Sequence, residues 1–184
     1  MSYDYTGSIL HLDLSSKKYW IEHPEENFYR TYWGGRALAL YYMLKEMKPH
    51  TDPLSPNNLL IFAPSVITGT PAPAIPRYTV CAKSPLTGAQ GEAEAGGWWG
   101  PELKKAGFDV IIKGSSKTPV YLWIKDATHL WGKDTGTTQK IIKEELADDK
   151  IRIAQTGPAG ENLVRFANIV NELNILTVGM AWEQ

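Results

Sequence analysis

The sequence contains a single cysteine, Cys81, among 184 residues. One thiol excludes an internal disulfide, and it excludes a zinc or iron–sulfur site built from the cysteines of this chain alone. Cys81 lies in the alternating run Tyr78–Lys83, which is typical of a strand. We expect a small buried hydrophobe there, with a reactive thiol as the alternative. No metal ligand is predicted, because the histidines have no metal-binding spacing: His11, His23, His50 and His129.

Long apolar runs and clusters of basic residues are also missing. No apolar run approaches the ~20 residues that cross a bilayer, so no membrane association is predicted. The N-terminus lacks the basic-then-apolar pattern of a secretory signal. The formal net charge is -1 at pH 7, and basic residues gather only in pairs such as Lys17-Lys18, which argues against a nucleic-acid partner. These absences predict a protein of the reducing cytoplasm.

The composition that remains is that of an ordinary globular domain. Hydrophobic residues make up 43% of the chain and charged residues 21%. Expected strands outnumber expected helices and are joined by short turns, which favours an α+β fold over a doubly wound sheet. The expected strands are 9–14, 17–23, 59–63, 77–83, 109–113, 120–125, 151–155 and 165–170, with a further short extended piece after the turn that ends at Gly88. The expected helices are 25–33, 36–48, 137–146 and a segment from the Gly96-Gly97 pair to Ala106.

The expected helix 36–48 has apolar residues at the spacing of one helical face. Met43, Leu44 and Met47 lie three, four and seven residues after Leu40. This pattern predicts that these four side chains form the buried stripe of the helix.

Three segments concentrate glycine, proline and small polar residues, namely Thr68–Pro73, Ala93–Gly100 and Thr156–Asn162. Glycine lets the main chain approach a ligand closely. The Gly96-Gly97 pair precedes an expected helix, so it indicates either an anion site at a helix N-terminus or a simple cap.

Arg77 and the Trp98-Trp99 pair stand beside these segments. The guanidinium of Arg77 could reach a phosphate or a pterin-like heterocycle, and a surface ion pair is the alternative. Adjacent tryptophans on a helix point about 100° apart, so we expect one in the core and the other on a ligand or partner surface. Glu92 and Glu94 would share one face of a strand, which a solvated face explains equally well.

Five segments occur in an order that resembles the N-terminal domain of the aldehyde:ferredoxin oxidoreductase family, whose members carry a tungsten or molybdenum bis-pterin. The resemblance runs from Tyr5 to Asn174. It implies an α+β fold of two β-sheets with pseudo-twofold character and a few helices, serving as the base for the metallopterin. The five segments are Leu54–Asn58, Thr68–Pro73, Ala82–Gly88, Gly96–Lys104 and Gly157–Asn162.

The resemblance also assigns cofactor-binding residues. It implies that Arg77 bridges a pterin and a nearby 4Fe-4S cluster. It implies that Glu94, Ala95 and Gly96 approach the pterin and its phosphate-bound magnesium, and Gly97 belongs to the same set. The best-known members have asparagine at the position of Glu94. The replacement of asparagine by glutamate is tolerated if the contact with the cofactor is made through the main chain.

The same resemblance limits what this chain does alone. In the family, the cysteines that hold the 4Fe-4S cluster and the acid/base groups lie in later domains, so no catalytic residue is predicted here. We expect a metallopterin scaffold over residues 1–174 that is inactive in isolation. Ferredoxin and an aldehyde are the partners of the full-length family. The tail 175–184 departs from the family. When the tail is back-translated and read in another frame, its possible codons permit the glycine-rich loop that the family has at this point. This observation predicts a frameshift.

Two alternative functions stay open. The chain could be a non-catalytic interaction domain, because a domain without its neighbours exposes apolar surface that self-association or a catalytic subunit can bury. It could also bind a small molecule through the glycine-rich loops alone.

Overall fold

The computed structural model describes residues 7–116, 135–148, 150–156, 169–171 and 174–176. The strands are β1 (Ile9–Asp13), β2 (Lys18–Glu22), β3 (Leu60–Pro64), β4 (Tyr78–Lys83), β5 (Gln90–Ala95), β6 (Asp109–Lys113), β7 (Ala154–Thr156), β8 (Ile169–Asn171) and β9 (Asn174–Leu176). The helices are α1 (Glu26–Tyr32), α2 (Gly35–Glu46), α3 (Trp99–Lys105) and α4 (Thr135–Glu145).

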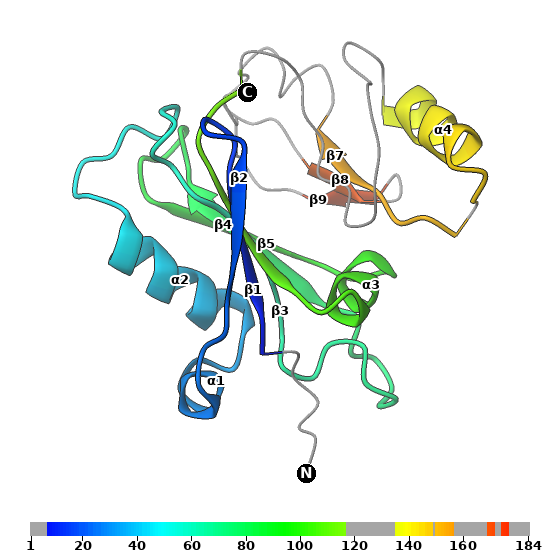
Figure 1. Cartoon of the computed structure of the whole chain (residues 1–184), viewed down its shortest axis with the longest axis horizontal. Coiled ribbons are helices and arrows are strands. Elements are labelled where there is room, and N and C mark those ends of the chain that lie inside the picture. The colour runs from blue at the N-terminus through cyan, green and yellow to red at the C-terminus, as the bar shows by residue number, and fades with distance from the viewer. Residues whose placement is uncertain (1–6, 117–134, 149, 157–168, 172–173, 177–184) are drawn as a thin grey trace.

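Two sheets organise the chain, which confirms the α+β fold. The larger sheet has six strands in the order β2-β1-β6-β3-β4-β5, and the smaller one has the order β7-β8-β9. All pairings are antiparallel except β1 with β6, which is parallel. Figure 1 shows α1 and α2 on one face of the large sheet and α3 on the other, on the side that carries the small sheet.

The hairpin of β1 and β2 matches the alternating pattern at the start of the sequence. Its register pairs His11 with Trp20 and Leu12 with Tyr19. Two main-chain N–H groups, those of Ser15 and Ser16, donate to Oδ1 of Asp13 in the connecting turn at 3.0 and 3.2 Å. An aspartate that bonds to the backbone two residues on stabilises a turn at this position.

The core consists of one apolar cluster on each face of the large sheet. On the first face α1 and α2 cover Ile9, Leu59, Ile61, Ala63, Cys81 and Ile111. On the second face α3 and β8 cover Leu10, Leu60, Phe62, Tyr78, Val80, Ala82, Val110 and Ile112. Because β3, β4 and β6 are covered on both faces, they are buried along nearly their whole length, as expected for central strands.

Cys81 lies in the first of these clusters and is fully buried. Burial raises the pKa of its thiol to about 11, since the thiolate is poorly solvated there. The prediction of a small buried hydrophobe is therefore confirmed.

The predicted buried stripe of α2 is wrong for Leu40 and Leu44, whereas Met43 is buried and Met47 packs half-buried against the core. Leu40 is 37% exposed, Leu44 is 76% exposed, and Met47 is only partly buried. Helix α2 packs on β3 and β4 through a different face, which consists of Leu38, Ala39, Tyr42 and Met43. Small Ala39 lets the helix approach the sheet, and the large ring of Tyr42 fills the remaining space. Apolar spacing along the sequence reflects neither of these properties.

Other element boundaries differ by small amounts. Helix α4 begins at Thr135 rather than Thr137, and β7 begins at Ala154 rather than Ile151. The predicted strand 120–125 and the loop 157–162 lie outside the described residues. The proposed boundary after Asn174 falls inside β9.

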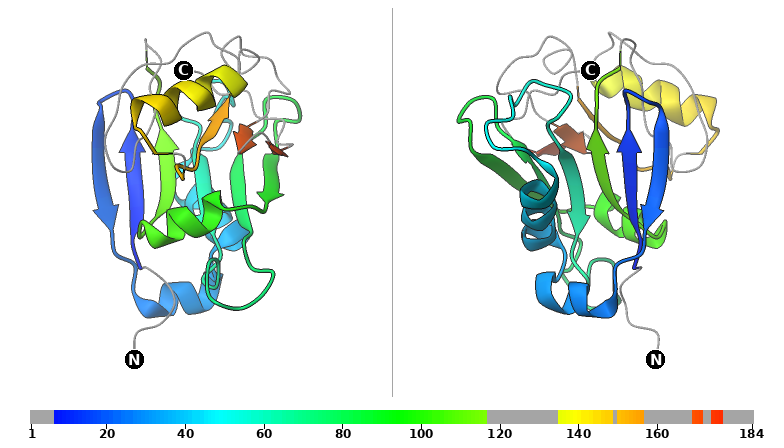
Figure 2. Two further views of the ribbon diagram at one scale, coloured as in Figure 1. Left: turned by 90° about the vertical axis from the view of Figure 1, so that its right-hand side faces the viewer. Right: turned by 60° about the vertical axis from the view of Figure 1, so that its left-hand side comes forward.

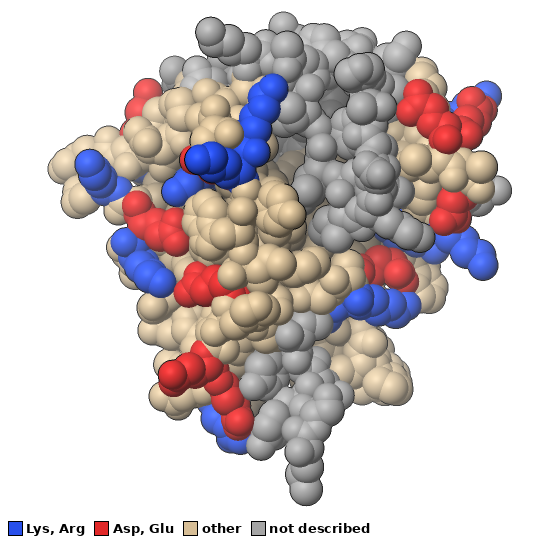
Figure 3. All heavy atoms as spheres, viewed as in Figure 1, with Lys and Arg blue, Asp and Glu red and all other residues tan. Residues whose placement is uncertain are grey.

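The surface of the described residues carries both signs of charge. Both acidic and basic side chains are spread over the face seen in Figure 3. Within the described part of the chain, no helix combines the length and the apolar character needed to span a membrane.

Candidate functional site

The residues predicted to bind a cofactor lie together at one end of the β4–β5 pair. The register places Tyr78 opposite Ala95 and Thr79 opposite Glu94. Continuing that register by one residue sets Arg77 opposite Gly96. Positions 15 to 19 residues apart in the sequence are therefore neighbours, because two antiparallel strands align them.

Arg77 and Glu94 form an ion pair at this end. Nη1 of Arg77 lies 3.2 Å from Oε2 of Glu94, and the two side chains are 70% and 46% exposed. An exposed pair of this kind contributes only about 0–1 kcal/mol to stability, because water screens it. The guanidinium can therefore exchange this carboxylate for a ligand at little cost to the fold.

The main chain of Arg77 is held more firmly than its side chain. Oγ1 of the buried Thr68 donates to the carbonyl oxygen of Arg77 at 2.6 Å and accepts from the N–H of Ser65 at 2.9 Å. The N–H of Gly69 donates to the carbonyl of Ile75 at 3.1 Å and closes the loop between them. The loop Thr68–Pro73, singled out from its composition, thus fixes the backbone from which Arg77 projects.

The second glycine-rich segment packs against the same loop. A Cβ at Gly100 would lie 2.9 Å from Cδ1 of Tyr78 and 3.0 Å from the carbonyl oxygen of Pro76. A Cβ at Gly69 would lie 3.2 Å from the Cα of Pro101. The first of these approaches is closer than real Cβ atoms show, and the other two are tighter than most. Glycine at both positions therefore lets the first turn of α3 rest closely on the segment leading to Arg77.

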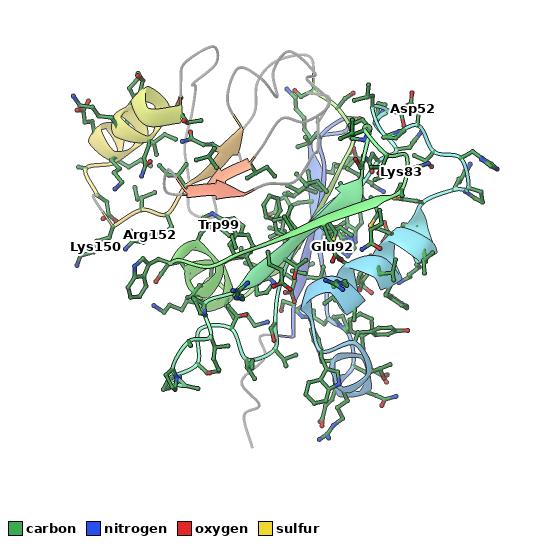
Figure 4. All side chains as sticks on the ribbon, turned by 180° about the vertical axis from the view of Figure 1, so that it is seen from behind. Asp52, Lys83, Glu92, Trp99, Lys150 and Arg152 are labelled. Atoms are coloured by element: carbon green, nitrogen blue, oxygen red, sulfur yellow. The ribbon has the colours of Figure 1, made fainter. Side chains whose placement is uncertain are left out.

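The two tryptophans divide as the sequence predicts. The ring of Trp99 packs on Phe62 and Tyr78 with centroids 5.1 and 4.7 Å apart. Trp98 is 60% exposed, and the guanidinium of Arg152 lies 5.8 Å from its ring centroid. Figure 4 shows Trp99 and Arg152 on the side that carries α3 and Glu92 beside α2. Trp98 is therefore a surface aromatic next to the candidate site.

Helix α3 is a weak anion site by itself. It has seven residues and begins at Trp99, two positions after Gly97. Its N-cap is Trp98 rather than either glycine, and no side chain caps it. Such a short helix has a small dipole, so the N-terminus alone does not account for ligand binding.

Sequence reasoning missed a second arginine–glutamate pair on this strand. Arg36, in the first turn of α2, forms an ion pair with Glu92. Glu92 and Glu94 are two residues apart on β5 and therefore lie on the same face. The alternation of the two glutamates was the available signal, but nothing in the spacing indicated that α2 would bring an arginine to them.

The donor set at Arg77 and Glu94 fits a phosphorylated pterin with a divalent cation. A guanidinium presents a planar fork of N–H donors that matches phosphate. A carboxylate supplies the hard oxygen ligand that magnesium prefers. Because the two groups are adjacent, a cation on Glu94 and a phosphate on Arg77 would neutralise each other. The third glycine-rich segment, 156–162, lies outside the described residues apart from Thr156.

Comparison with known proteins gives consistent matches. The sequence matches the family model described as aldehyde ferredoxin oxidoreductase, N-terminal domain, over residues 9–180. It is 45% identical over 174 residues to a tungsten-containing aldehyde ferredoxin oxidoreductase of Pyrococcus furiosus, covering 90% of this chain and 29% of the relative. The corresponding protein of Thermococcus kodakarensis is 46% identical with the same coverage.

A more distant relative and a solved structure extend these matches. The WOR-like subunit of an aliphatic sulfonate oxidoreductase of Pyrococcus furiosus is 32% identical, covering 93% of this chain and 31% of the relative. The active-site complex BamBC of benzoyl coenzyme A reductase, solved with 1,5-dienoyl-CoA, superposes with a TM-score of 0.90 at 33% identity. It covers 100% of this chain and 30% of the neighbour. The chain spans about three tenths of the length of the relatives it matches.

Proposed function

Since the chain belongs to the aldehyde ferredoxin oxidoreductase family, as its N-terminal domain, we propose that it forms one wall of a tungsten bis-pterin site. One observation carries the proposal. The strand register brings Arg77 and the segment Glu94–Gly97 together, although the family resemblance assigned these residues to the cofactor from separate motifs. The resemblance to tungsten-containing relatives supports the identity of the metal.

Each residue has a distinct part in the proposed site. The guanidinium of Arg77 binds pterin oxygens or phosphate, and its fixed backbone orients it. Glu94 holds the magnesium that accompanies the phosphate, and Ala95, Gly96 and Gly97 offer main-chain groups without side-chain obstruction. The metallopterin, when bound, supplies the redox chemistry. These residues bind and orient it, and none of them is proposed to exchange a proton with substrate.

The activity of a complete family protein is a further part of this proposal. We propose oxidation of an aldehyde with transfer of electrons to ferredoxin, in a protein or assembly that adds the parts matching the other seven tenths of the relatives. A 4Fe-4S cluster close to Arg77 would carry the electrons, held by cysteines from those parts. The isolated chain is expected to be inactive, because the resemblance assigns the cluster cysteines and the acid/base groups to those other parts.

Cofactor content tests the proposal without an activity assay. The 184-residue chain is purified from an anaerobic host supplied with tungstate, and tungsten and released oxidised pterin are measured per chain. We expect both to copurify with the unaltered chain and to fall about tenfold in Arg77→Ala, which removes a charge-assisted contact. Arg30→Ala is the matched control, because Arg30 forms a surface ion pair with Glu26 on α1. The proposal would be contradicted if Arg77→Ala and Arg30→Ala contained equal amounts of tungsten and pterin. It would also be contradicted if the unaltered chain contained neither.

Self-association is a second candidate role, and exposed apolar side chains favour it. The chain would then act as an interaction domain, as a homo-oligomer or with a catalytic subunit. The large hydrophobic residues that are exposed are Tyr19, Trp20, Ile21, Trp33, Leu40, Leu44, Ile67, Leu86 and Trp98. Three consecutive members of this group, residues 19–21, lie on one strand.

A further inference from the structure

Strand β2 is an edge strand with an unusual surface. In the described part of the chain its single strand neighbour is β1, and Figure 2 shows it at the outer margin of the large sheet. Tyr19 is 70% exposed, and Trp20 and Ile21 are each 42% exposed. An edge strand offers a row of backbone N–H and C=O groups, and exposed apolar side chains make it prone to pair with another strand.

The order of side chains on β2 is complementary to itself. If two copies pair antiparallel about Trp20, Lys18 lies opposite Glu22 and Tyr19 lies opposite Ile21, and each of these pairs occurs twice. Lys18, Trp20 and Glu22 share one face of the strand, and Tyr19 and Ile21 share the other. Opposite charges and aromatic–aliphatic pairs are the cross-strand combinations that stabilise sheets.

The usual protection of an edge strand is missing here. A strand that carries lysines alone would repel its own copy, which is how many proteins keep edges apart. In β2 the lysine at one end meets a glutamate at the other end in the antiparallel copy.

Contacts within the chain already hold the side chains of Trp20 and Glu22 on β2. The ring of Trp20 stacks on His11 with centroids 4.7 Å apart and an interplanar angle of 9°. Nζ of Lys113 lies 5.2 Å from the centroid of the same ring. Nε2 of His11 and Oε2 of Glu22 are hydrogen-bonded at 2.8 Å. A fixed aromatic anchor loses little conformational entropy when it binds.

Glu22 keeps capacity for a partner's lysine in this arrangement. Its other oxygen, Oε1, lies 3.7 Å from Nζ of Lys45, which is too long for a good hydrogen bond. A carboxylate has about four acceptor sites, so a further N–H donor can be accommodated.

We propose that this chain forms a twofold dimer in which β2 pairs antiparallel with β2 of a second copy, centred on Trp20. The two six-stranded sheets then continue as one across the dimer axis. This inference names the surface for the self-association suggested above, and it does not depend on pterin binding.

Sedimentation equilibrium of the 184-residue chain between about 1 and 100 μM tests the proposal, since a short strand pair gives a weak to moderate interface. We expect a monomer–dimer equilibrium whose dissociation constant rises at least about tenfold in Ile21→Lys, because the symmetric interface loses two pairs at once. Lys18→Glu should weaken the dimer similarly by creating two like-charge pairs. Leu44→Lys is the matched control at an exposed apolar residue outside β2, and it should leave the equilibrium unchanged.

Cysteine cross-linking tests the register. The double variant Tyr19→Cys/Ile21→Cys should form a covalent dimer on oxidation, since the two positions face each other across the axis within disulfide reach. Tyr19→Cys alone should not, because its copies are two residues apart along the strands. Cys81 does not compete, since it is buried. A monomer at all concentrations, an unchanged equilibrium in Ile21→Lys, or equal cross-linking of the single variant would each overturn the proposal. Cofactor content in the same samples is a separate measurement.

Discussion

Nζ of Lys104 lies 3.9 Å from Oδ1 of Asp109, and the two side chains are 6% and 0% exposed. The separation is too long for a hydrogen bond. Within the described part of the chain, neither charged group has a hydrogen-bond partner for its side chain. The pair joins the last turn of α3 to the first residue of β6, so it fixes the helix that rests on the segment of Arg77.

Removing one member of this pair should destabilise the fold strongly. Lys104→Met leaves the carboxylate of Asp109 buried without a counter-charge, which costs about 3–5 kcal/mol. Lys104→Met combined with Asp109→Leu should regain most of that loss, because apolar residues of similar size replace a buried ion pair well. Urea unfolding of the three proteins at pH 7 measures the difference. A single variant as stable as the unaltered chain would contradict this account.

The same pair predicts a pH dependence with a definite sign. Desolvation raises the pKa of Asp109 from 3.8 to about 6, although Lys104 acts in the opposite direction. A carboxyl whose pKa is higher in the folded state contributes most to stability when protonated, and it loses that contribution as pH rises through the folded value. Relative to Asp109→Asn, the unaltered chain should therefore lose about 2–3 kcal/mol of unfolding free energy between pH 4 and pH 7.

This second prediction is checked by urea unfolding of both proteins at several pH values. The difference in unfolding free energy between them should change with pH in that window and become constant above it. A difference that is constant from pH 4 upward would show that Asp109 titrates as an exposed carboxyl.

The single thiol reports on the integrity of the core. Because burial raises the pKa of Cys81 to about 11, little thiolate forms near pH 8 in the folded protein. We expect a disulfide reagent such as Ellman's to modify almost no thiol in the native chain and one thiol per chain in denaturant. Rapid modification of the native protein at pH 8 would place Cys81 at the surface.

Gly34 and Gly88 form a matched pair for testing a backbone constraint. Both have positive φ, but a Cβ at Gly34 would lie 2.4 Å from the carbonyl oxygen of Pro64, whereas a Cβ at Gly88 would meet no atom within 4 Å. Gly34 also has a ψ of -162°, a region that essentially excludes other residues. Gly34→Ala should cost about 3 kcal/mol or more, and Gly88→Ala about 1–2 kcal/mol. Thermal and urea unfolding compare them, and equal costs would contradict the close approach.

Arg77 should be dispensable for folding. Its side chain is 70% exposed and, among the residues that the structure describes, forms an ion pair only with Glu94. Arg77→Ala should therefore change the unfolding free energy by no more than about 0.5 kcal/mol. Urea unfolding of this variant is needed beside the cofactor measurement. A large loss of stability would mean that reduced cofactor content reflects unfolding rather than a lost contact.

Several features followed from local sequence alone. Alternation predicted the β1–β2 hairpin and the buried strand of Cys81, and glycine and proline marked the loop that precedes Arg77. The pair Trp98-Trp99 was expected to divide between core and surface, and it does. These predictions succeed because hydrophobic period and turn chemistry act over a few neighbouring residues.

Other features were decided only by tertiary structure. Helix α2 has apolar residues on two faces, and spacing alone favoured the face of Leu40 and Leu44, but the sheet selected the face of Ala39 and Tyr42 for its fit. The meeting of Arg36 with Glu92 likewise depends on where α2 crosses the sheet. The sequence by itself determined which segments form strands, helices and turns. The packing of those segments determined which side chains share a surface, because contacts between distant residues depend on shape and volume that no local pattern encodes.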